Sequence, residues 1–191
     1  MVATQPPKIA TTEPSTEEQS LFSLEDFMLH PPNHMEWIDG ELVETTGMTV
    51  RHGTLQSRLS RFWGNHVDSQ KLGGEVVTET ACRTLNQGRR PDVAYMSPEL
   101  VAQYGQAAGL PRSFPLIAEI ASPDDSAEGL FAKAIEYLES GCQEVWLVFP
   151  EARIVLAKTA ETAWQLFNPG DAIATQTTLQ GFSIPLDELL A

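Results

Sequence analysis

The chain has 191 residues, 42% of them hydrophobic and 20% charged, which predicts one globular domain with a complete hydrophobic core. Its formal net charge of −14 argues against non-specific nucleic-acid binding over the whole surface. The longest apolar runs are strand-sized and residues 1–20 lack the apolar segment of a signal peptide, so we expect a cytoplasmic protein without a membrane span. Cys82 and Cys142 lack metal-type spacing and are expected to be buried thiols.

Residues 1–20 are polar and aperiodic, which predicts a disordered tail in front of a single domain at residues 21–191. The sequence from Ser23 to Asp26 resembles a capping box, so a short helix should begin there and end before the prolines at 31–32. Next, Asp39-Gly40 joins two alternating segments, residues 35–38 and 41–44, and predicts a β-hairpin. The acidic residues of this hairpin are Glu36, Glu41 and Glu44, and we expect them to face mainly solvent. Glu41 or Glu44 could still supply an outer metal contact.

A helical pattern follows and ends before Gly73-Gly74; its apolar stripe consists of Leu55, Leu59, Phe62 and Trp63. Residues 75–85 alternate and predict one strand, with a turn at Gly88 and a second strand at residues 91–96. Residues 98–111 predict a surface excursion with one helical turn.

Residues 116–120 predict a third strand, apolar except for Glu119. A turn at 122–126 leads into a helix capped by Asp125 or Ser126 and ended by Gly141, and residues 144–149 predict a buried strand. This strand–helix–strand unit should be a right-handed parallel crossover. Residues 152–158 and 162–167 predict an antiparallel pair at the sheet edge, and residues 187–191 a terminal helical turn. The order of elements predicts an α/β fold with a mixed β-sheet flanked by helices.

Two acids lie in short apolar runs that predict buried strands. Burial of a lone carboxylate is costly, so Asp92 and Glu119 should be paired, hydrogen-bonded or bound to a cation. If their strands are neighbours, the carboxylates meet at one end of the sheet, and the carbonyl of Ile120 could complete the oxygen ligands of Mg²⁺ or Mn²⁺. Such an ion activates water for attack on a phosphate. Asp92 could instead be a turn residue that opens its strand.

Two further residues are candidates beside this pair of acids. Lys133 borders the apolar stripe of its predicted helix, and its ammonium could orient the attacking water or hold the phosphate. It could equally be an exposed lysine paired with Glu136 or Glu139. His52, at a helix start, could contact phosphate or lie near the metal, or it could be a hydrogen-bonded surface group.

Residues 51–90 carry seven basic and three acidic side chains, whereas both flanks are acidic. A basic segment in an acidic protein can meet a phosphate backbone, although a solvated helix face gives the same pattern. The candidate DNA contacts are Arg51, Arg58, Arg89 and Arg90.

Three segments resemble those of one family. They are Arg-Arg-Pro-Asp-Val-Ala from residue 89, Ala-Glu-Ile-Ala-Ser-Pro-Asp-Asp-Ser from residue 118, and Ala-Lys-Ala-Ile-Glu-Tyr-Leu-Glu-Ser-Gly-Cys-Gln-Glu-Val-Trp-Leu-Val from residue 132. With the hairpin and the helix after it, they are similar to the bacterial Uma-type restriction-endonuclease family of the PD-(D/E)XK nuclease superfamily, over residues 21–170. The resemblance implies a restriction-endonuclease-like fold, a magnesium-type metal, and a metal-dependent endonuclease that hydrolyses DNA phosphodiester bonds.

In that resemblance Asp92 matches the metal-binding aspartate and Glu119 the second acid. The chain departs from the pattern twice: Ala121 stands where the superfamily has lysine, for which Lys133 is the best replacement, and Phe149 stands where the family often has an acid. The missing lysine and the net charge favour an alternative, a catalytically inactive nuclease-fold module that binds DNA or a protein partner. Cleavage of both strands would suit a homodimer.

Overall fold

The computed structural model describes residues 22–45 and 49–191, and its centre is a six-stranded mixed sheet. The strand order is β10-β9-β8-β7-β6-β3, in which β7 and β8 run parallel and the other neighbours antiparallel. The strands are β3 (Glu75–Thr78), β6 (Val93–Met96), β7 (Leu116–Ile120), β8 (Glu144–Phe149), β9 (Ile154–Thr159) and β10 (Gln165–Phe167). The tail predicted at residues 1–20 lies outside the described residues.

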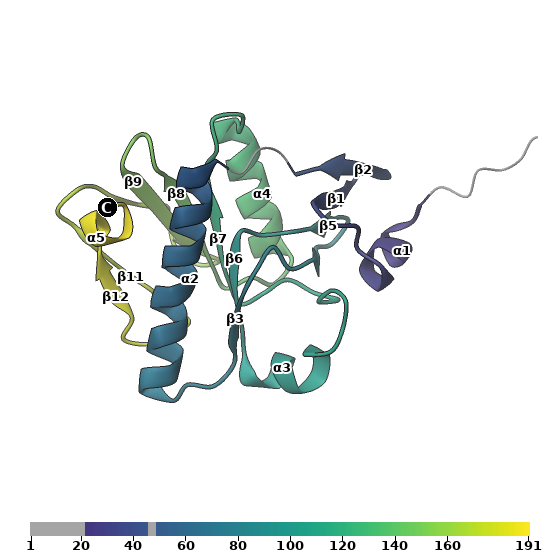
Figure 1. Ribbon diagram of the computed structural model, residues 1–191, viewed down its shortest axis with the longest axis horizontal. Coiled ribbons are helices and arrows are strands. Elements are labelled where there is room, and N and C mark those ends of the chain that lie inside the picture. Colours follow the sequence, from purple (N-terminus) through teal and green to yellow (C-terminus); the bar gives the residue numbers. More distant parts are fainter. Residues whose placement is uncertain (1–21, 46–48) are drawn as a thin grey trace, which may run out of the picture.

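Two helices cover opposite faces of this sheet, α2 (Val50–Gln70) and α4 (Ala127–Glu139), as Figure 1 shows. Helix α2 begins where the Thr49 hydroxyl accepts the backbone N–H of His52 at 3.1 Å. Helix α4 begins with the same kind of cap, because the Ser126 hydroxyl accepts the N–H of Gly129. Within the described residues no helix is long and apolar enough to cross a membrane.

The alternation of side chains along the buried strand β7 sends them to two separate core clusters. Leu116, Ala118 and Ile120 pack in the cluster that contains the apolar stripe of α2, where Trp63 and Trp146 meet edge to face at 5.5 Å. Ile117 packs on the α4 side. Glu119 lies on that side too, because its carboxylate contacts two residues of α4. The strand therefore places one acid beneath α4.

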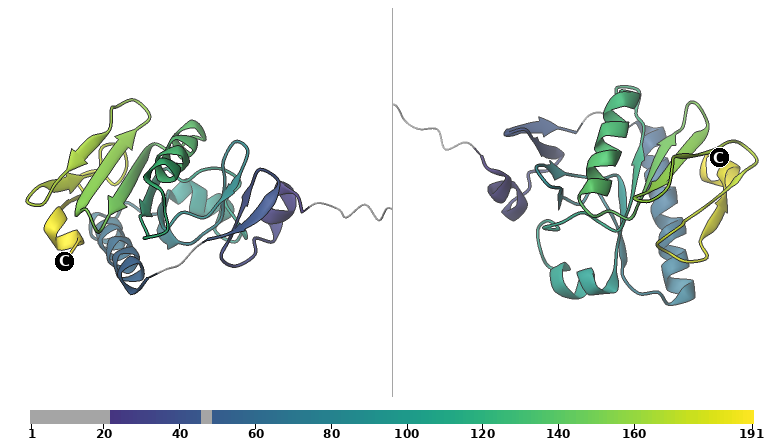
Figure 2. Two further views of the ribbon diagram at one scale, coloured as in Figure 1. Left: turned by 90° about the horizontal axis from the view of Figure 1, so that it is seen from above. Right: turned by 180° about the vertical axis from the view of Figure 1, so that it is seen from behind.

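A second sheet has the strand order β2-β1-β5-β4 and contains the predicted hairpin (Figure 2). Its strand β1 contacts α4 through Glu36 and Lys133. Its strands are β1 (Met35–Ile38), β2 (Glu41–Glu44), β4 (Cys82–Arg83) and β5 (Gly88–Arg89). The short helix α1 (Leu24–Leu29), with the predicted capping box, packs Phe27 against Gly88. The remaining elements are α3 (Pro98–Tyr104), β11 (Ala172–Ala174), β12 (Ser183–Pro185) and α5 (Leu186–Leu189).

The α/β class, the hairpin, both long helices and the central strands are confirmed, and both cysteines are free and buried. Two expectations were wrong. Residues 75–85 form two strands in different sheets, because Glu79 adopts a left-handed backbone (φ 50°) that ends β3. Gly88 lies in β5 rather than in a turn, since its missing side chain leaves room for the ring of Phe27. The excursion at residues 98–111 contains a helix, as expected, but one of seven residues rather than a single turn, and the small sheet of β11 and β12 was not foreseen.

Candidate active site

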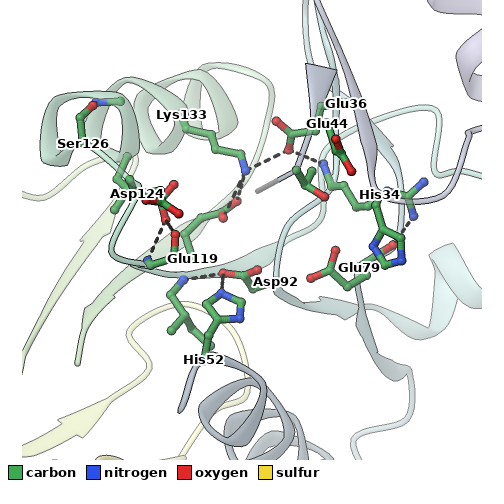
Figure 3. A pocket seen from close by; sticks show the side chains of 17 residues that line it. His34, Glu36, Glu44, His52, Glu79, Asp92, Glu119, Asp124, Ser126 and Lys133 are labelled. Carbon is green, nitrogen blue, oxygen red and sulfur yellow. Dashed lines mark hydrogen bonds and ion pairs between the residues drawn. The ribbon is translucent and has the colours of Figure 1, made fainter. Parts of the chain in front are cut away.

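Strands β6 and β7 bring the two predicted acids together. Their antiparallel register pairs Val93 with Ala118, and the same register extended by one residue places Asp92 opposite Glu119. Residues directly opposite in such a pair lie on the same face of a sheet. Both acids line one pocket (Figure 3). The volume of this pocket is about 410 Å³, and Ile120 also lines it. The strands are thus neighbours, as the sequence analysis required.

Asp92 is half-buried and held on two sides. One carboxylate oxygen, Oδ2, accepts the backbone N–H of Ile120 at 2.6 Å and lies 3.2 Å from Nε2 of His52. The strand β7 and the helix α2 therefore fix this carboxylate between them. Asp92 is more than a turn residue at a strand start.

Glu119 is only 3% exposed, and its carboxylate accepts hydrogen bonds from two side chains of α4. The Tyr137 hydroxyl donates to Oε1 at 2.8 Å, and Nζ of Lys133 lies 3.2 Å from each carboxylate oxygen. Burial raises the pKa of Glu119 to about 8, against the opposing effect of the Lys133 ammonium and with the help of the charge on Asp92. An acid with this pKa retains its proton through much of the neutral range.

Lys133 joins Glu119 to the hairpin, because Nζ also lies 2.9 Å from Oε1 of Glu36. Its partners are thus two buried acids rather than Glu136 or Glu139. Burial disfavours the ammonium, but the charges of Glu119 and Glu36 outweigh it and raise the pKa of Lys133. The lysine is a permanent cation inside the pocket.

The expectation that Glu36 faces solvent was wrong, since this residue is 6% exposed. Besides Lys133, its carboxylate contacts Arg89 at 3.2 Å and accepts the backbone N–H of Arg90 at 2.9 Å. Burial would raise the pKa of Glu36, but the two cations outweigh it and lower that pKa. The alternation along β1 identifies the two faces of the strand, but it does not show that α4 and β5 cover the acidic one.

His52 is also buried, at 6% exposure, so it is not a surface group. Burial disfavours the imidazolium, but the hydrogen bond and charge of Asp92 prevail and raise the pKa of His52. Its second ring nitrogen, Nδ1, is buried and has no hydrogen-bond partner within residues 22–45 and 49–191. Glu79, a further acid in the pocket, bonds to Gln56 at 2.8 Å, and burial together with the charge of Asp92 raises its pKa. Glu79 was not among the predicted site residues, because it lies in the middle of residues 75–85, which were predicted as one continuous strand.

The four arginines proposed as DNA contacts have different surroundings. Arg89 is mostly buried and bonds to Glu136 and Glu36, and Arg58 donates to the carbonyls of Leu189 and Ala191 near the chain end. The guanidinium of Arg90 donates to three backbone carbonyls at the pocket wall, those of Pro32, Met35 and Glu79. Arg51 is exposed and pairs with Glu151 at 2.7 Å. Of the four, Arg51 is the one on the open surface.

The donor set at the sheet end fits a small, hard cation. Asp92, Glu119 and the carbonyl of Ile120 offer oxygen atoms only, and Mg²⁺ completes such a set with water and phosphate oxygens. Two carboxylates on directly opposed positions repel each other unless a cation lies close by. Across residues 22–45 and 49–191 no three Asp, Glu, His or Cys side chains form a ready metal-binding group. The protein ligands would therefore be two carboxylates and one carbonyl.

Comparisons with known proteins bear on the family and the fold of the chain. The model of the Uma2 family, described as "Putative restriction endonuclease", matches residues 19–187. Among solved structures, the chain resembles a protein described as a putative nuclease belonging to DUF820 from Anabaena variabilis, with a TM-score of 0.78 and 18% sequence identity. That match covers 87% of this chain and 96% of the other, and it confirms the predicted fold class. A search of curated proteins found no match.

Proposed function

The chain belongs to the Uma2 family, and from that premise we propose that it is a metal-dependent endonuclease that hydrolyses DNA phosphodiester bonds. Membership supports a nuclease-like role in general. The observation that supports the finer proposal is the position of Asp92 opposite Glu119, with the Lys133 ammonium on the second acid. Acids and an amine at one end of a central sheet suit hydrolysis of a charged phosphate ester.

In this proposal Asp92, Glu119 and the carbonyl of Ile120 hold Mg²⁺ or Mn²⁺. When bound, such an ion lowers the pKa of a coordinated water and neutralises charge on the scissile phosphate. Because its pKa is raised, Glu119 would have to lose a proton in order to serve as a ligand.

Lys133 and His52 act beside the ligands. Because its pKa is raised, Lys133 stays protonated and donates hydrogen bonds, to the attacking water or to a phosphate oxygen, rather than removing a proton. His52 contacts Asp92 through Nε2 while its other nitrogen is buried, so its part is to orient the aspartate. We therefore assign His52 as a positioning residue within the catalytic group.

The residues proposed to contact DNA directly are Arg51, which is exposed on α2, and Arg90, which lines the pocket. Arg89 and Arg58 would contribute indirectly, because they fix Glu36 and the C-terminal residues. A homodimer, in which two sites are related by a two-fold axis, would let the protein cut both strands. Sedimentation velocity of the purified protein tests that part separately.

The experiment that tests the function uses plasmid and oligonucleotide DNA with Mg²⁺ or Mn²⁺, the wild-type protein, and Asp92→Asn and Glu119→Gln variants. We expect cleavage by the wild type, and a loss of at least about 100-fold in both variants, the scale for removal of one preorganised electrostatic group. Glu128→Gln is the matched control, since this exposed acid of α4 does not line the pocket. Cleavage at the wild-type rate by both site variants would refute the assignment.

One observation favours a second candidate, the inactive module that binds DNA or a protein. Lys133 contacts both oxygens of Glu119, the Tyr137 hydroxyl donates to the same group, and the raised pKa lets this acid keep its proton, so Glu119 is satisfied in the fold without any metal. Calorimetric titration with Mn²⁺ separates the candidates. Binding that Asp92→Asn abolishes supports the nuclease, and absence of binding together with inert protein supports the module.

A further inference from the structure

A second pocket, of about 450 Å³, lies beside the candidate active site, and we call it the β8 pocket. Ala121 and Phe149, which follow and end the parallel strands β7 and β8, line it, with Pro123 and Pro150. It shares three lining residues with the catalytic pocket: His52, Ser122 and Asp125. A group held here would therefore be adjacent to a phosphate at the metal ligands. Crevices at the carboxyl ends of parallel strands are common ligand sites.

The wall of the β8 pocket is held in place by hydrogen bonds. The backbone N–H of Ala121 donates to the carbonyl of Val148 at 2.8 Å, which fixes the two strand ends side by side. The N–H and hydroxyl of Ser122 both donate to Oδ2 of Asp125, at 2.7 and 2.8 Å, and close the turn before α4. A pocket built on such elements exists before a ligand arrives.

The lining is chemically suited to a flat aromatic group. Phe149, the two prolines and three alanines supply apolar surface, while Arg51 and Glu151 lie at the rim. A base that stacks on an aromatic side chain, with its phosphate beside a cation, is the usual arrangement in single-strand binding.

The charge of the protein also argues against a duplex as the ligand. The chain carries a net charge of −14, and the guanidinium groups of Arg58 and Arg89 bond within the protein, so these two candidate contacts are not free to neutralise the dense charge of a duplex. A base stacked inside a duplex also cannot enter a side pocket unless it is unpaired. Resting on the proposed nuclease function, we infer that the β8 pocket holds an unpaired nucleobase next to the scissile phosphate. The substrate is then single-stranded DNA, or DNA with unpaired nucleotides.

Binding without turnover tests this inference. A fluorescent twelve-residue oligothymidylate is titrated with the full chain in Ca²⁺, alongside an abasic oligomer of equal length and the corresponding duplex. We expect the intact single strand to bind about tenfold or more tightly than the abasic strand, the scale of base–aromatic stacking. The duplex should bind more weakly than the intact strand at the same salt concentration.

Two variants change the pocket in different ways. Phe149→Leu keeps apolar volume in the core but removes the aromatic face. Ala121→Leu, next to Phe149 in the β7–β8 register extended by one residue, fills the space while the Phe149 ring itself is retained. Each should bring the ratio of intact to abasic affinity toward one, whereas Leu166→Ala, at an exposed apolar residue of β10, should leave it unchanged. Thermal unfolding of each variant identifies any that does not fold, and the other variant then decides.

The outcomes separate the inference from the function on which it rests. Equal affinity for intact and abasic strands overturns the base pocket, even if the protein cleaves DNA. Absence of DNA binding overturns it as well. A protein that never cleaves but prefers the intact strand, and loses this preference in both variants, supports the pocket and rejects the nuclease. Tighter binding of the duplex also overturns the inference.

Discussion

The raised pKa of Glu119 predicts how the free energy of unfolding changes with pH, in the absence of DNA and metal. Burial, with the nearby charges of Asp92 and Glu36, raises this pKa from 4.5 to about 8 although Lys133 opposes the shift. Between these two pH values the folded protein holds a proton that the unfolded chain has released. The free energy of unfolding should therefore fall as the pH rises from 4.5 to about 8.

The magnitude follows from the same two values. Each pH unit of difference between the folded and unfolded pKa is worth about 1.4 kcal/mol, so Glu119 can contribute a decline of up to about 5 kcal/mol. Other groups titrate in this interval too, and the comparison with Glu119→Gln isolates the one residue. The amide keeps the shape of the protonated acid, can still accept the Tyr137 hydroxyl, and cannot ionise.

Urea unfolding in EDTA at half-unit steps from pH 5 to pH 8.5 measures the effect. The wild-type curve should decline more steeply than that of Glu119→Gln, with a difference of several kcal/mol between the ends of the range. The exposed Glu128→Gln should follow the wild type. Parallel curves for wild type and Glu119→Gln would refute the reasoning, because they would mean that Lys133 keeps this acid ionised throughout.

Three further predictions concern residues around the site. Lys133→Met should lower the free energy of unfolding by about 3–5 kcal/mol at pH 8, since Glu36 and the ionised fraction of Glu119 then lie buried without the cation that they share, and Mn²⁺ should restore part of the loss in a thermal melt. Arg89→Ala should cost a similar amount, about 3–5 kcal/mol, because Glu136 loses its partner; a stable variant with weakened DNA binding would instead favour a direct DNA contact. Gly88→Ala should cost about 1–3 kcal/mol in urea unfolding, since a methyl group there collides with the phenylalanine ring of α1; wild-type stability would show that α1 shifts freely.

The elements that the sequence predicted are those set by short-range chemistry. The Ser23–Asp26 capping box, the Asp39-Gly40 turn and the apolar stripe of α2 each depend on residues within a few positions of one another. The split of residues 75–85 into two strands depends on a left-handed backbone at Glu79, a residue type that seldom adopts it, so no local signal announces the break.

The two acids of the candidate site could be predicted from the sequence, because each lies in a short apolar run. Their pairing could not, since the register of β6 against β7 is set by side-chain packing on both faces of the sheet. Glu36 was missed for a related reason. Its exposure depends on the distance between the hairpin and α4, and Arg89 and Lys133 bring their charges to it from segments 53 and 97 positions away in the chain.

In the proposed nuclease, Lys133 would take the place of the lysine that the nuclease pattern has at residue 121, where this chain has Ala121. Helix α4 covers the face of β7 that bears Glu119. Lys133, on the side of α4 that faces the sheet, therefore brings its ammonium to that acid. Glu36 then holds the same ammonium from the hairpin side. Ala121 on its own is therefore weak evidence for an inactive protein. What decides activity is whether Lys133 can exchange Glu119 for a phosphate oxygen when a metal takes the carboxylate, and an amine already shared between two acids can release one while it keeps the other.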